Sequence, residues 1–370
     1  MTDVVLVGFK RTPFHPANKG ALTKVRPDDL LAAAIRGLLA ETGVDANLIE
    51  DLIVGCAFPE AEQGFNIGRI VGQLVGLPVT VAGVTVNRFC GSSMQAIHMA
   101  AGAINSGAGE AFLCGGVESM TRIPMGGFNP MPNPALVKSY PQAYIGMGET
   151  AENVGKKYGI TRVAQEEFAL KSHQKAAAAA AAGKFKDEIV AIGDVASDGC
   201  IRPETTMEAM ATLKPAFDTA GTVTAATSSP VTDGAAVTLV CSAEFAKKHG
   251  LKPMAKIRGM AVSGCAADIM GMGPVGASQK ALDRAGLKLS DMDIIELNEA
   301  FAAQSLGVIT EMKAPLEKIN LDGGAIALGH PLGASGARIT AKAASLLQRE
   351  KKKYALATMC IGGGQGIATV

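Results

Sequence analysis

The sequence predicts an α/β fold built from two similar halves, with a further segment inserted into the first half. Three observations lead to this prediction. Short apolar runs typical of buried strands alternate with helical patterns along most of the 370 residues. Two stretches of the chain align with each other without a gap. A third stretch, residues 117–223, matches neither half.

The duplication is clearest where Thr42–Phe58 ("TGVDANLIEDLIVGCAF") is set against Ala285–Phe301 ("AGLKLSDMDIIELNEAF"). Each segment follows a helical pattern, Leu30–Leu39 in one half and Ala277–Arg284 in the other. Each ends in a short apolar run of the kind found in buried strands. Strands that alternate with helices imply sheets with helices packed on them.

A second correspondence covers residues 90–116 and 332–363, each a small-residue turn, a helix, a strand and a pair of glycines. The strands are expected at Ala111–Cys114 and Tyr354–Cys360. Short strands at Val4–Val7 and Ala255–Ile257 are expected to open the two halves. We therefore divide the chain into residues 1–250 and 251–370.

The segment 117–223 is expected to form an inserted loop domain. It contains "RIPMGGFNPMPNP", a loop by its glycine and proline content, and one long Ala-rich helical pattern. Thr161 is a plausible N-cap for this helix and Gly183 ends it. Such an insertion would cover the mouth of an active site.

Composition and charge exclude several classes of protein. The formal net charge is +1 and no basic block is present, so we expect no nucleic-acid partner. The uncharged stretch from Val71 to Asn87 contains three glycines and a proline, which argues against a membrane span. The seven cysteines include no CxxC pair, so neither a disulfide framework nor a structural metal site is expected. The N-terminus lacks the pattern of a signal peptide, and we expect a cytoplasmic protein.

Cys90 lies in "VNRFCGSSMQA", between an apolar run and an Ala-rich helical pattern at residues 94–105. At a helix N-terminus the free N–H groups and the dipole favour an anion, so the pKa of a thiol there is expected to fall. The small residues that follow leave room for a substrate. A buried, structural cysteine in a tight turn is an equally good interpretation of this stretch alone.

Three further blocks hold candidate chemical groups. His330 is framed by glycines in "GGAIALGHPLGASGAR", and an imidazole commonly activates a thiol. Cys360 ends an apolar strand and runs into glycines in "CIGGGQG". Asn298 and Glu299, in "NEAFA", replace small residues of the first half at a strand end, which suggests a site. Structural roles, such as helix capping by Asn298, are the alternatives.

These blocks together resemble the thiolase family, in the family's order and along nearly the whole chain. The resemblance implies two α/β halves in a five-layered core, a loop domain inserted in the first half, and homodimers or homotetramers. It implies acyl-CoA and CoA as substrates, with no separate cofactor. The reaction expected is reversible thiolytic cleavage of 3-ketoacyl-CoA by CoA to acyl-CoA plus acetyl-CoA.

The resemblance also implies residue roles. Cys90 would carry the acyl group, His330 would activate it, and Cys360 would be the acid/base. Asn298, through a water, and His330 would form one oxyanion hole. The backbone N–H groups of Cys90 and Gly362 would form the other.

The inserted segment resembles the family's coenzyme A-binding loop domain. Arg202, in "CIRPETT", stands where the family places an arginine against the adenine. Ser229, in "TAATSSPVTDGAA", stands where a serine contacts the pantetheine arm.

Two departures from the family bear on substrate and mechanism. Acetoacetyl-specific members carry a His-Met pair where this chain has Gly146 and Met147, which argues against a strict short-chain, biosynthetic role. The blocks "IRPETT" and "NRFCGSSMQA" look more like those of the degradative, broad-chain members. Asp322 stands where asparagine is common. We expect little consequence, although a carboxylate near His330 would raise its pKa.

Other functions stay open at this stage. An acetoacetyl-CoA thiolase that condenses two acetyl-CoA is the main alternative. A decarboxylating condensing enzyme shares the fold, but Cys360 argues against it. A non-catalytic acyl-CoA-binding member would be expected to lack Cys90, His330 or Cys360. Service as one subunit of a fatty-acid oxidation complex is neither indicated nor excluded.

Overall fold

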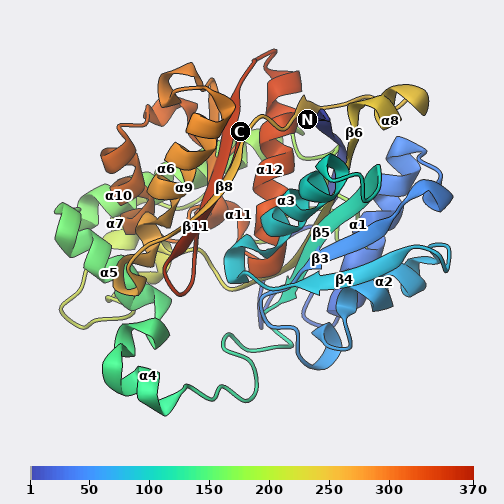
Figure 1. The fold of residues 1–370 in the computed structure, drawn as a ribbon. Helices are drawn as coiled ribbons and strands as arrows, with labels where there is room; N and C mark the ends of the chain where they lie inside the picture. The colour runs from blue at the N-terminus through green and yellow to red at the C-terminus, as the bar shows by residue number, and fades with distance from the viewer. Residues whose placement is uncertain (1) are drawn as a thin grey trace.

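A computed structural model describes residues 2–370 and contains two β-sheets with helices between and outside them (Figure 1). The first sheet has seven strands, in the order β4-β3-β5-β6-β1-β7, with β2 paired to β6. The second has four, in the order β8-β11-β10-β9. The strands of the first sheet are Val4–Arg11 (β1), His15–Pro16 (β2), Asp51–Gly55 (β3), Ala82–Val86 (β4), Ala111–Ser119 (β5), Thr232–Ser242 (β6) and Ala255–Lys256 (β7). Those of the second are Met260–Gly264 (β8), Ile294–Leu297 (β9), Ala355–Ile361 (β10) and Gln365–Thr369 (β11).

The two sheets share one plan. In the first, β3 and β5 are parallel, while β5–β6 and β6–β1 are antiparallel. In the second, β9 and β10 are parallel, while β10–β11 and β11–β8 are antiparallel. The two sets of four strands therefore match in order and direction, and the predicted duplication is confirmed.

Helices fill the space between the sheets and cover both outer faces. The central layer is α3 (Ser92–Asn105) and α12 (Leu332–Arg349), which contact each other and both sheets. The outer face of the first sheet is covered by α1 (Pro27–Thr42), α2 (Ile67–Val75) and α8 (Ala243–Lys248). The outer face of the second is covered by α9 (Gly273–Ala285) and α10 (Ala302–Met312). This order, helix-sheet-helix-sheet-helix, confirms the five-layered α/β core.

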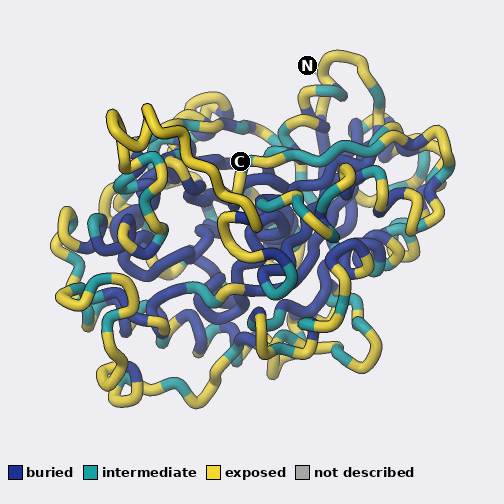
Figure 2. Tube along the Cα trace, turned by 90° about the horizontal axis from the view of Figure 1, so that it is seen from below, coloured by how far each residue is buried: buried dark blue, intermediate teal, exposed yellow. Residues whose placement is uncertain are grey.

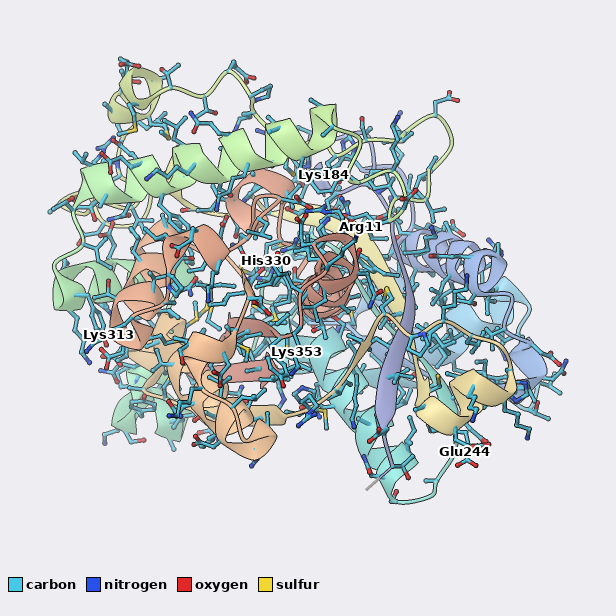
Figure 3. The ribbon with its side chains drawn as sticks, turned by 90° about the horizontal axis from the view of Figure 1, so that it is seen from above. Arg11, Lys184, Glu244, Lys313, His330 and Lys353 are labelled. Atoms are coloured by element: carbon cyan, nitrogen blue, oxygen red, sulfur yellow. The ribbon has the colours of Figure 1, made fainter. Side chains whose placement is uncertain are left out.

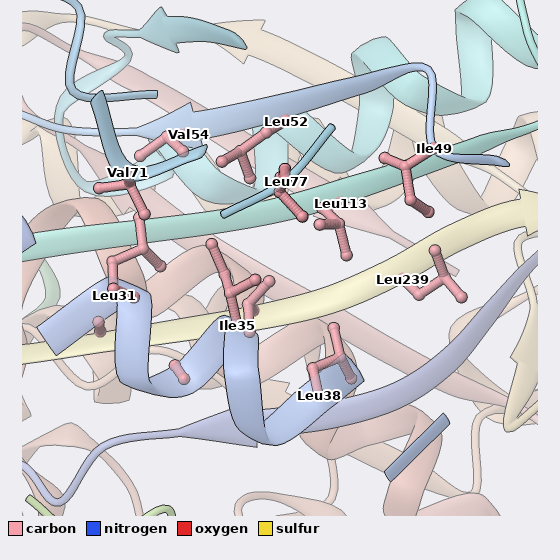
Figure 4. Packing of buried hydrophobic residues seen from close by; sticks show 14 of the residues in the cluster. Leu31, Ile35, Leu38, Ile49, Leu52, Val54, Val71, Leu77, Leu113 and Leu239 are labelled. Carbon is pink, nitrogen blue, oxygen red and sulfur yellow. The ribbon is translucent and has the colours of Figure 1, made fainter. Parts of the chain in front are cut away.

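Apolar faces of the predicted period hold the layers together. Leu31, Ile35 and Leu38 recur at helical spacing on α1 and pack against Leu113 and Leu239 of the first sheet (Figure 4). Most residues of helix α12 are buried, including the charged Arg338 and Lys342, because the helix lies between the two sheets. Figure 2 shows this buried interior surrounded by exposed loops.

One predicted strand belongs to the other half. The expectation that Ala255–Ile257 opens the second half was wrong, because β7 pairs with β1 in the first sheet. The N–H of Met254 donates to Leu6 O (2.8 Å) and that of Ile257 to Val4 O (2.9 Å). The linker between the halves thus pairs with the free edge of β1. The second half opens with β8 instead.

The inserted segment lies between β5 and β6 and therefore starts after Ser119 rather than near Val117. The Gly115-Gly116 pair suggested that the strand ends there, but β5 continues. A Cβ on Gly116 would lie 2.0 Å from Gly333 O, so this glycine allows α12 to approach the sheet. The helices of the segment are α4 (Pro134–Ser139), α5 (Met147–Tyr158), α6 (Arg162–Ala181) and α7 (Met207–Ala211).

The long helix of the insertion forms as predicted. The Thr161 hydroxyl accepts from the N–H of Ala164 (3.2 Å) at the start of α6. Gly183, just beyond its end, has a φ of +71°, which favours glycine. Helix α6 then packs on α10 and on α11 (Ala325–Leu328), which precedes His330.

Candidate active site

Cys90 lies in a single 3-10 turn, Phe89–Gly91, directly before α3. Phe89 has a φ of +42°, an unfavourable conformation for a bulky side chain. Hydrogen bonds fix this turn: Asn87 Oδ1 accepts from the N–H of Phe89 (2.8 Å), and the Ser92 hydroxyl donates to Phe89 O (2.6 Å). The turn holds the thiol at the N-terminus of the central helix, where it is 8% exposed.

The expected fall in the pKa of Cys90 does not occur. Burial raises the pKa of its thiol to about 11, and the N–H groups of Gly362 and of Cys90 itself offset only part of this rise. The charge of Glu118 raises the pKa further. Removing the sulfur from water costs more than the stabilisation that the helix N-terminus gives a thiolate. At neutral pH Cys90 is therefore a protonated thiol.

His330 stands between α11 and α12, near the centre of the molecule (Figure 3). Its Nδ1 is 2.5 Å from Ser335 Oγ, and that hydroxyl donates to Pro331 O (3.0 Å). Since the hydroxyl proton is used there, we assign the imidazole proton to Nδ1. Nε2 is then unprotonated, and it lies 3.3 Å from Asn298 Nδ2, which donates to it.

The electrostatic surroundings keep His330 neutral. Burial lowers the pKa of His330 to about 3, and the charge of Arg338 acts in the same direction. Asp322, whose charge could have raised this pKa, does not shift it. Asp322 is instead ion-paired with Arg349 (2.6 Å) and Lys342 (2.9 Å). Although burial alone would raise it, these cations bring the pKa of Asp322 down to about 2.

Cys360 is fully buried next to the last residue of β10. Burial raises the pKa of its thiol well above the ordinary value, and a negative charge on Cys90 would raise it further. Cys360 packs in an apolar cluster that includes Met147 and Phe301. A Cβ on the following glycine, Gly362, would lie 3.5 Å from Met147 Sδ, so Gly362 belongs to the same surroundings.

The side chains of Asn298 and Glu299 make contacts in different places in the structure. Asn298 is fully buried beside His330, and its Oδ1 has no hydrogen-bond partner among residues 2–370. Glu299 accepts from Ser172 Oγ (2.6 Å), Asn320 Nδ2 (2.7 Å) and the N–H of Ile326 (3.2 Å). These bonds tie α6 and α11 to the end of β9. Only Asn298 thus faces the histidine.

Arg202 and Ser229 lie away from these contacts. The Arg202 side chain is exposed, and its backbone N–H donates to His173 Nδ1 on α6 (3.2 Å). Ser229 is half-buried, and its N–H donates to Ala300 O (3.0 Å), just after Asn298. Both residues belong to the inserted segment or its end.

Three residues at the site were missed by sequence reasoning. Ser335 orients His330, and its signal is its place in the first turn of a helix that follows a glycine-framed histidine. Thr232 accepts from the N–H of His330 (3.0 Å), and no local signal marks it. Glu118 is a buried acid after a Gly-Gly pair, and its partners lie far away in the sequence.

Residues 2–370 contain no cluster of His, Cys, Asp or Glu that could bind a metal ion, and no helix among them is long and apolar enough to cross a bilayer.

Known proteins match nearly the whole chain. Residues 4–244 match the family "Thiolase, N-terminal domain" and residues 251–370 match "Thiolase, C-terminal domain". A protein named 3-ketoacyl-CoA thiolase from Bacillus subtilis (strain 168) is 47% identical, covering 100% of this chain and 99% of the relative. One from Aeromonas hydrophila is 51% identical with the same coverage.

Solved structures give the same answer. The crystal structure of human mitochondrial 3-ketoacyl-CoA thiolase has a TM-score of 0.92 and 39% identity, covering 100% of this chain and 98% of that one. The same human protein in complex with CoA gives a TM-score of 0.91 and 40% identity, covering 100% and 97%. With both halves matched end to end, the chain belongs to the thiolase family.

Proposed function

We propose that the chain is a 3-ketoacyl-CoA thiolase, an acetyl-CoA C-acyltransferase. The observation that supports this most is that a thiol at a helix N-terminus, an unprotonated imidazole nitrogen and a second buried thiol come from separate halves of a duplicated fold. Full-length relatives of that name support it as well. Coenzyme A is a substrate in this reaction, and no separate cofactor is proposed.

The first step is acyl transfer to Cys90. His330 Nε2 takes the thiol proton as Cys90 Sγ attacks the C3 carbonyl of the 3-ketoacyl-CoA. The C2–C3 bond then breaks, leaving the acyl group on Cys90 and the enolate of acetyl-CoA. Cys360 donates its thiol proton to C2 of that enolate, and acetyl-CoA departs.

The second step returns the acyl group to CoA. The Cys360 thiolate takes the proton of the CoA thiol, and the CoA sulfur attacks the acyl carbon on Cys90. The Cys90 thiolate leaves and recovers its proton from His330. Every proton and thiol is restored at the end of the cycle.

Burial makes the resting groups neutral and couples their ionisation. A lone thiolate or a lone imidazolium is unfavourable in this interior, as both pKa shifts indicate. Formed together, the opposite charges stabilise each other. The proton therefore moves to His330 only as Cys90 attacks.

Two groups of donors are suited to the oxyanions of the reaction. The N–H groups of Cys90 and Gly362 face the Cys90 sulfur, so they would stabilise the oxyanion on the carbon attached to it. His330 and a water held by Asn298 would stabilise the enolate. The unpartnered, buried Asn298 Oδ1 supports this water, because such an oxygen needs a donor.

We further propose that the inserted segment binds coenzyme A, with Arg202 near the adenine and Ser229 near the pantetheine arm. The exposure of the Arg202 side chain and the position of Ser229 beside Ala300 are compatible with these roles. A relative of known structure has been solved with CoA.

A broad range of chain lengths is the proposed specificity. Met147 lies beside Gly362, and the preceding Gly146 carries no side chain toward the site. The alternative is an acetoacetyl-CoA thiolase. Thiolysis rates measured with 3-ketoacyl-CoA substrates of increasing chain length decide between them, because activity with acetoacetyl-CoA alone would overturn the broad-chain proposal.

Assembly and location complete the proposal. We propose a homodimer or homotetramer, since Phe65 and Val79, which flank α2 near the edge strand β4, are 93% and 88% exposed. Light scattering after gel filtration measures this. The seven free thiols support a reducing, cytoplasmic compartment. Copurification from a cell extract tests whether the chain has a partner in a fatty-acid oxidation complex.

A further inference from the structure

Glu118 is a fully enclosed carboxylate (1% exposed) near the end of β5, on the face of the first sheet that meets α3 and α12. Among residues 2–370 it has no ion-pair partner, and backbone and amide N–H groups are its main partners. Burial raises the pKa of this carboxyl, and the hydrogen bonds oppose that rise. An unpaired buried acid is costly unless its bonds serve a purpose.

One carboxylate oxygen reaches the histidine side of the active site. Glu118 Oε2 accepts from the N–H of Gly333 (2.9 Å), in the first turn of α12. Gly333 is three residues after His330, with Pro331 between them. A Cβ on Gly333 would lie 2.7 Å from Gly55 O, so the start of α12 is pressed against the first sheet. Glu118 therefore fixes the position of the first turn of α12, just after His330.

The same carboxylate holds a loop beside the nucleophile. It accepts from the N–H groups of Ala57 (2.8 Å) and Phe58 (3.2 Å) and from Gln63 Nε2 (2.7 Å). The Phe58 ring contacts the ring of Phe89, with centroids 6.0 Å apart.

Asn87 continues this connection to the cysteine turn. Its Nδ2 donates to Ala57 O (2.9 Å) and its Oδ1 accepts from the N–H of Phe89 (2.8 Å). Phe89 precedes Cys90 and has a positive φ, so the turn depends on outside support.

We propose that Glu118 is a positioning residue. It holds the turn that carries Cys90 (Phe89–Gly91) and the start of α12 after His330 in a fixed position relative to each other, across the two halves. This inference rests on the roles proposed for Cys90 and His330. A glutamine cannot replace the carboxylate, because both oxygens accept while an amide nitrogen only donates. The charge of Glu118 also acts on Cys90, and this gives a measurement independent of turnover.

The test is Glu118→Gln, compared with Glu299→Gln as the matched control. Both carboxylates are buried and accept from the N–H of the second residue of a helix, but only Glu118 acts on the Cys90 thiol. Mass spectrometry follows alkylation of Cys90 by iodoacetamide from pH 6 to 12, beside kcat, KM and melting temperature.

Glu118→Gln should move the midpoint of Cys90 alkylation to lower pH, because a nearby negative charge is removed. It should also lower kcat roughly 100-fold with KM for CoA unchanged, because misplacing reacting groups by about 1 Å has such an effect. Glu299→Gln should lower the melting temperature without moving the alkylation midpoint. An alkylation profile for Glu118→Gln identical to wild type, or an unchanged kcat, would overturn the inference.

Asn87→Ala keeps the proposal testable if Glu118→Gln does not fold. Asn87 is exposed, so the variant should fold. It should lower kcat roughly 10-fold with the alkylation midpoint unchanged, since it loosens the turn but keeps the charge. Wild-type kcat in this variant would count against the connection. If Cys90→Ser retained turnover, the proposed function would fail, while the alkylation profile would still report on Glu118.

Discussion

Strands β5 and β10 occupy equivalent places in the two sheets, but they differ after their cysteines. Cys114 lies in the middle of β5, and its thiol donates to Ala96 O of α3 (3.6 Å). Cys360 is next to last in β10, and the chain turns at once through Gly363 and Gly364, which have positive φ. The same residue type is therefore core in one half and part of the proposed site in the other. The position of the strand end decides which.

The neighbouring strands β3 and β9 show the same contrast. A Cβ on Gly55 would lie 2.3 Å from the N of Ser93, so the end of β3 has no room for a side chain. The end of β9 carries Asn298, whose amide reaches His330. The first half thus packs its helix tightly and presents the proposed nucleophile. The second half leaves space for the polar groups that are proposed to move protons.

The largest effect is expected at Cys90, the proposed nucleophile of the first half. Cys90→Ser should abolish acyl-enzyme formation and lower kcat by roughly 10⁴-fold or more, because a buried hydroxyl is a far weaker nucleophile. Intact-protein mass spectrometry after mixing with acyl-CoA measures the acyl-enzyme. Full turnover in Cys90→Ser would sink the nucleophile assignment.

A smaller effect is expected from the polar side of the second half. Asn298→Ala should lower kcat by about 10²- to 10³-fold, the usual effect of removing one oxyanion-hole donor. Binding of CoA should change little. Glu299→Gln, the next residue, is the control and should mainly lower the melting temperature. Activity of Asn298→Ala within threefold of wild type would argue against the proposed water at this position.

Asp322→Asn tests whether the charged cluster behind the site affects stability rather than catalysis. Breaking a buried ion pair on one side costs about 3 kcal/mol, so the free energy of unfolding should fall by that order while kcat is kept. Because the folded pKa of Asp322 is depressed to about 2, its stabilisation is present above pH 4 and is lost as pH falls toward 2. Denaturant titrations at pH 7 and pH 3 should show a smaller difference in the variant. A loss of kcat would mean that Asp322 reaches His330 after all.

The smallest effect is expected at Cys114, the residue of β5 that corresponds to Cys360. Cys114→Ala should cost about 1 kcal/mol of unfolding free energy, the order of magnitude for trimming a buried side chain. Its kcat should equal that of wild type. A large loss of activity would show that the two strands do not differ as described.

The sequence supported the duplicated fold because its signals are local. Helical periodicity in α1 and α9, the Thr161 cap of α6 and the four glycine-rich blocks each occupy a short stretch. The extension of β5 past Gly115-Gly116 was missed because those glycines look like a turn, whereas they serve a close approach by α12.

What could not be predicted depends on residues that folding brings together. The pKa of Cys90 rises because the sulfur is enclosed by both halves, which outweighs the helix N-terminus. Asp322 binds Lys342 and Arg349 instead of acting on His330. Glu118 and Gly333 are 215 positions apart, and no sequence pattern links them.

The separate roles proposed for Cys90 and Cys360 are tested most directly by Cys360→Ala. With acetyl-CoA, the variant should still acetylate Cys90, detected by mass spectrometry, while exchange of the C2 protons of acetyl-CoA with deuterated water, followed by NMR, should be lost. Cys114→Ala should show both. Proton exchange at the wild-type rate in Cys360→Ala would contradict the assignment of Cys360 as the acid/base.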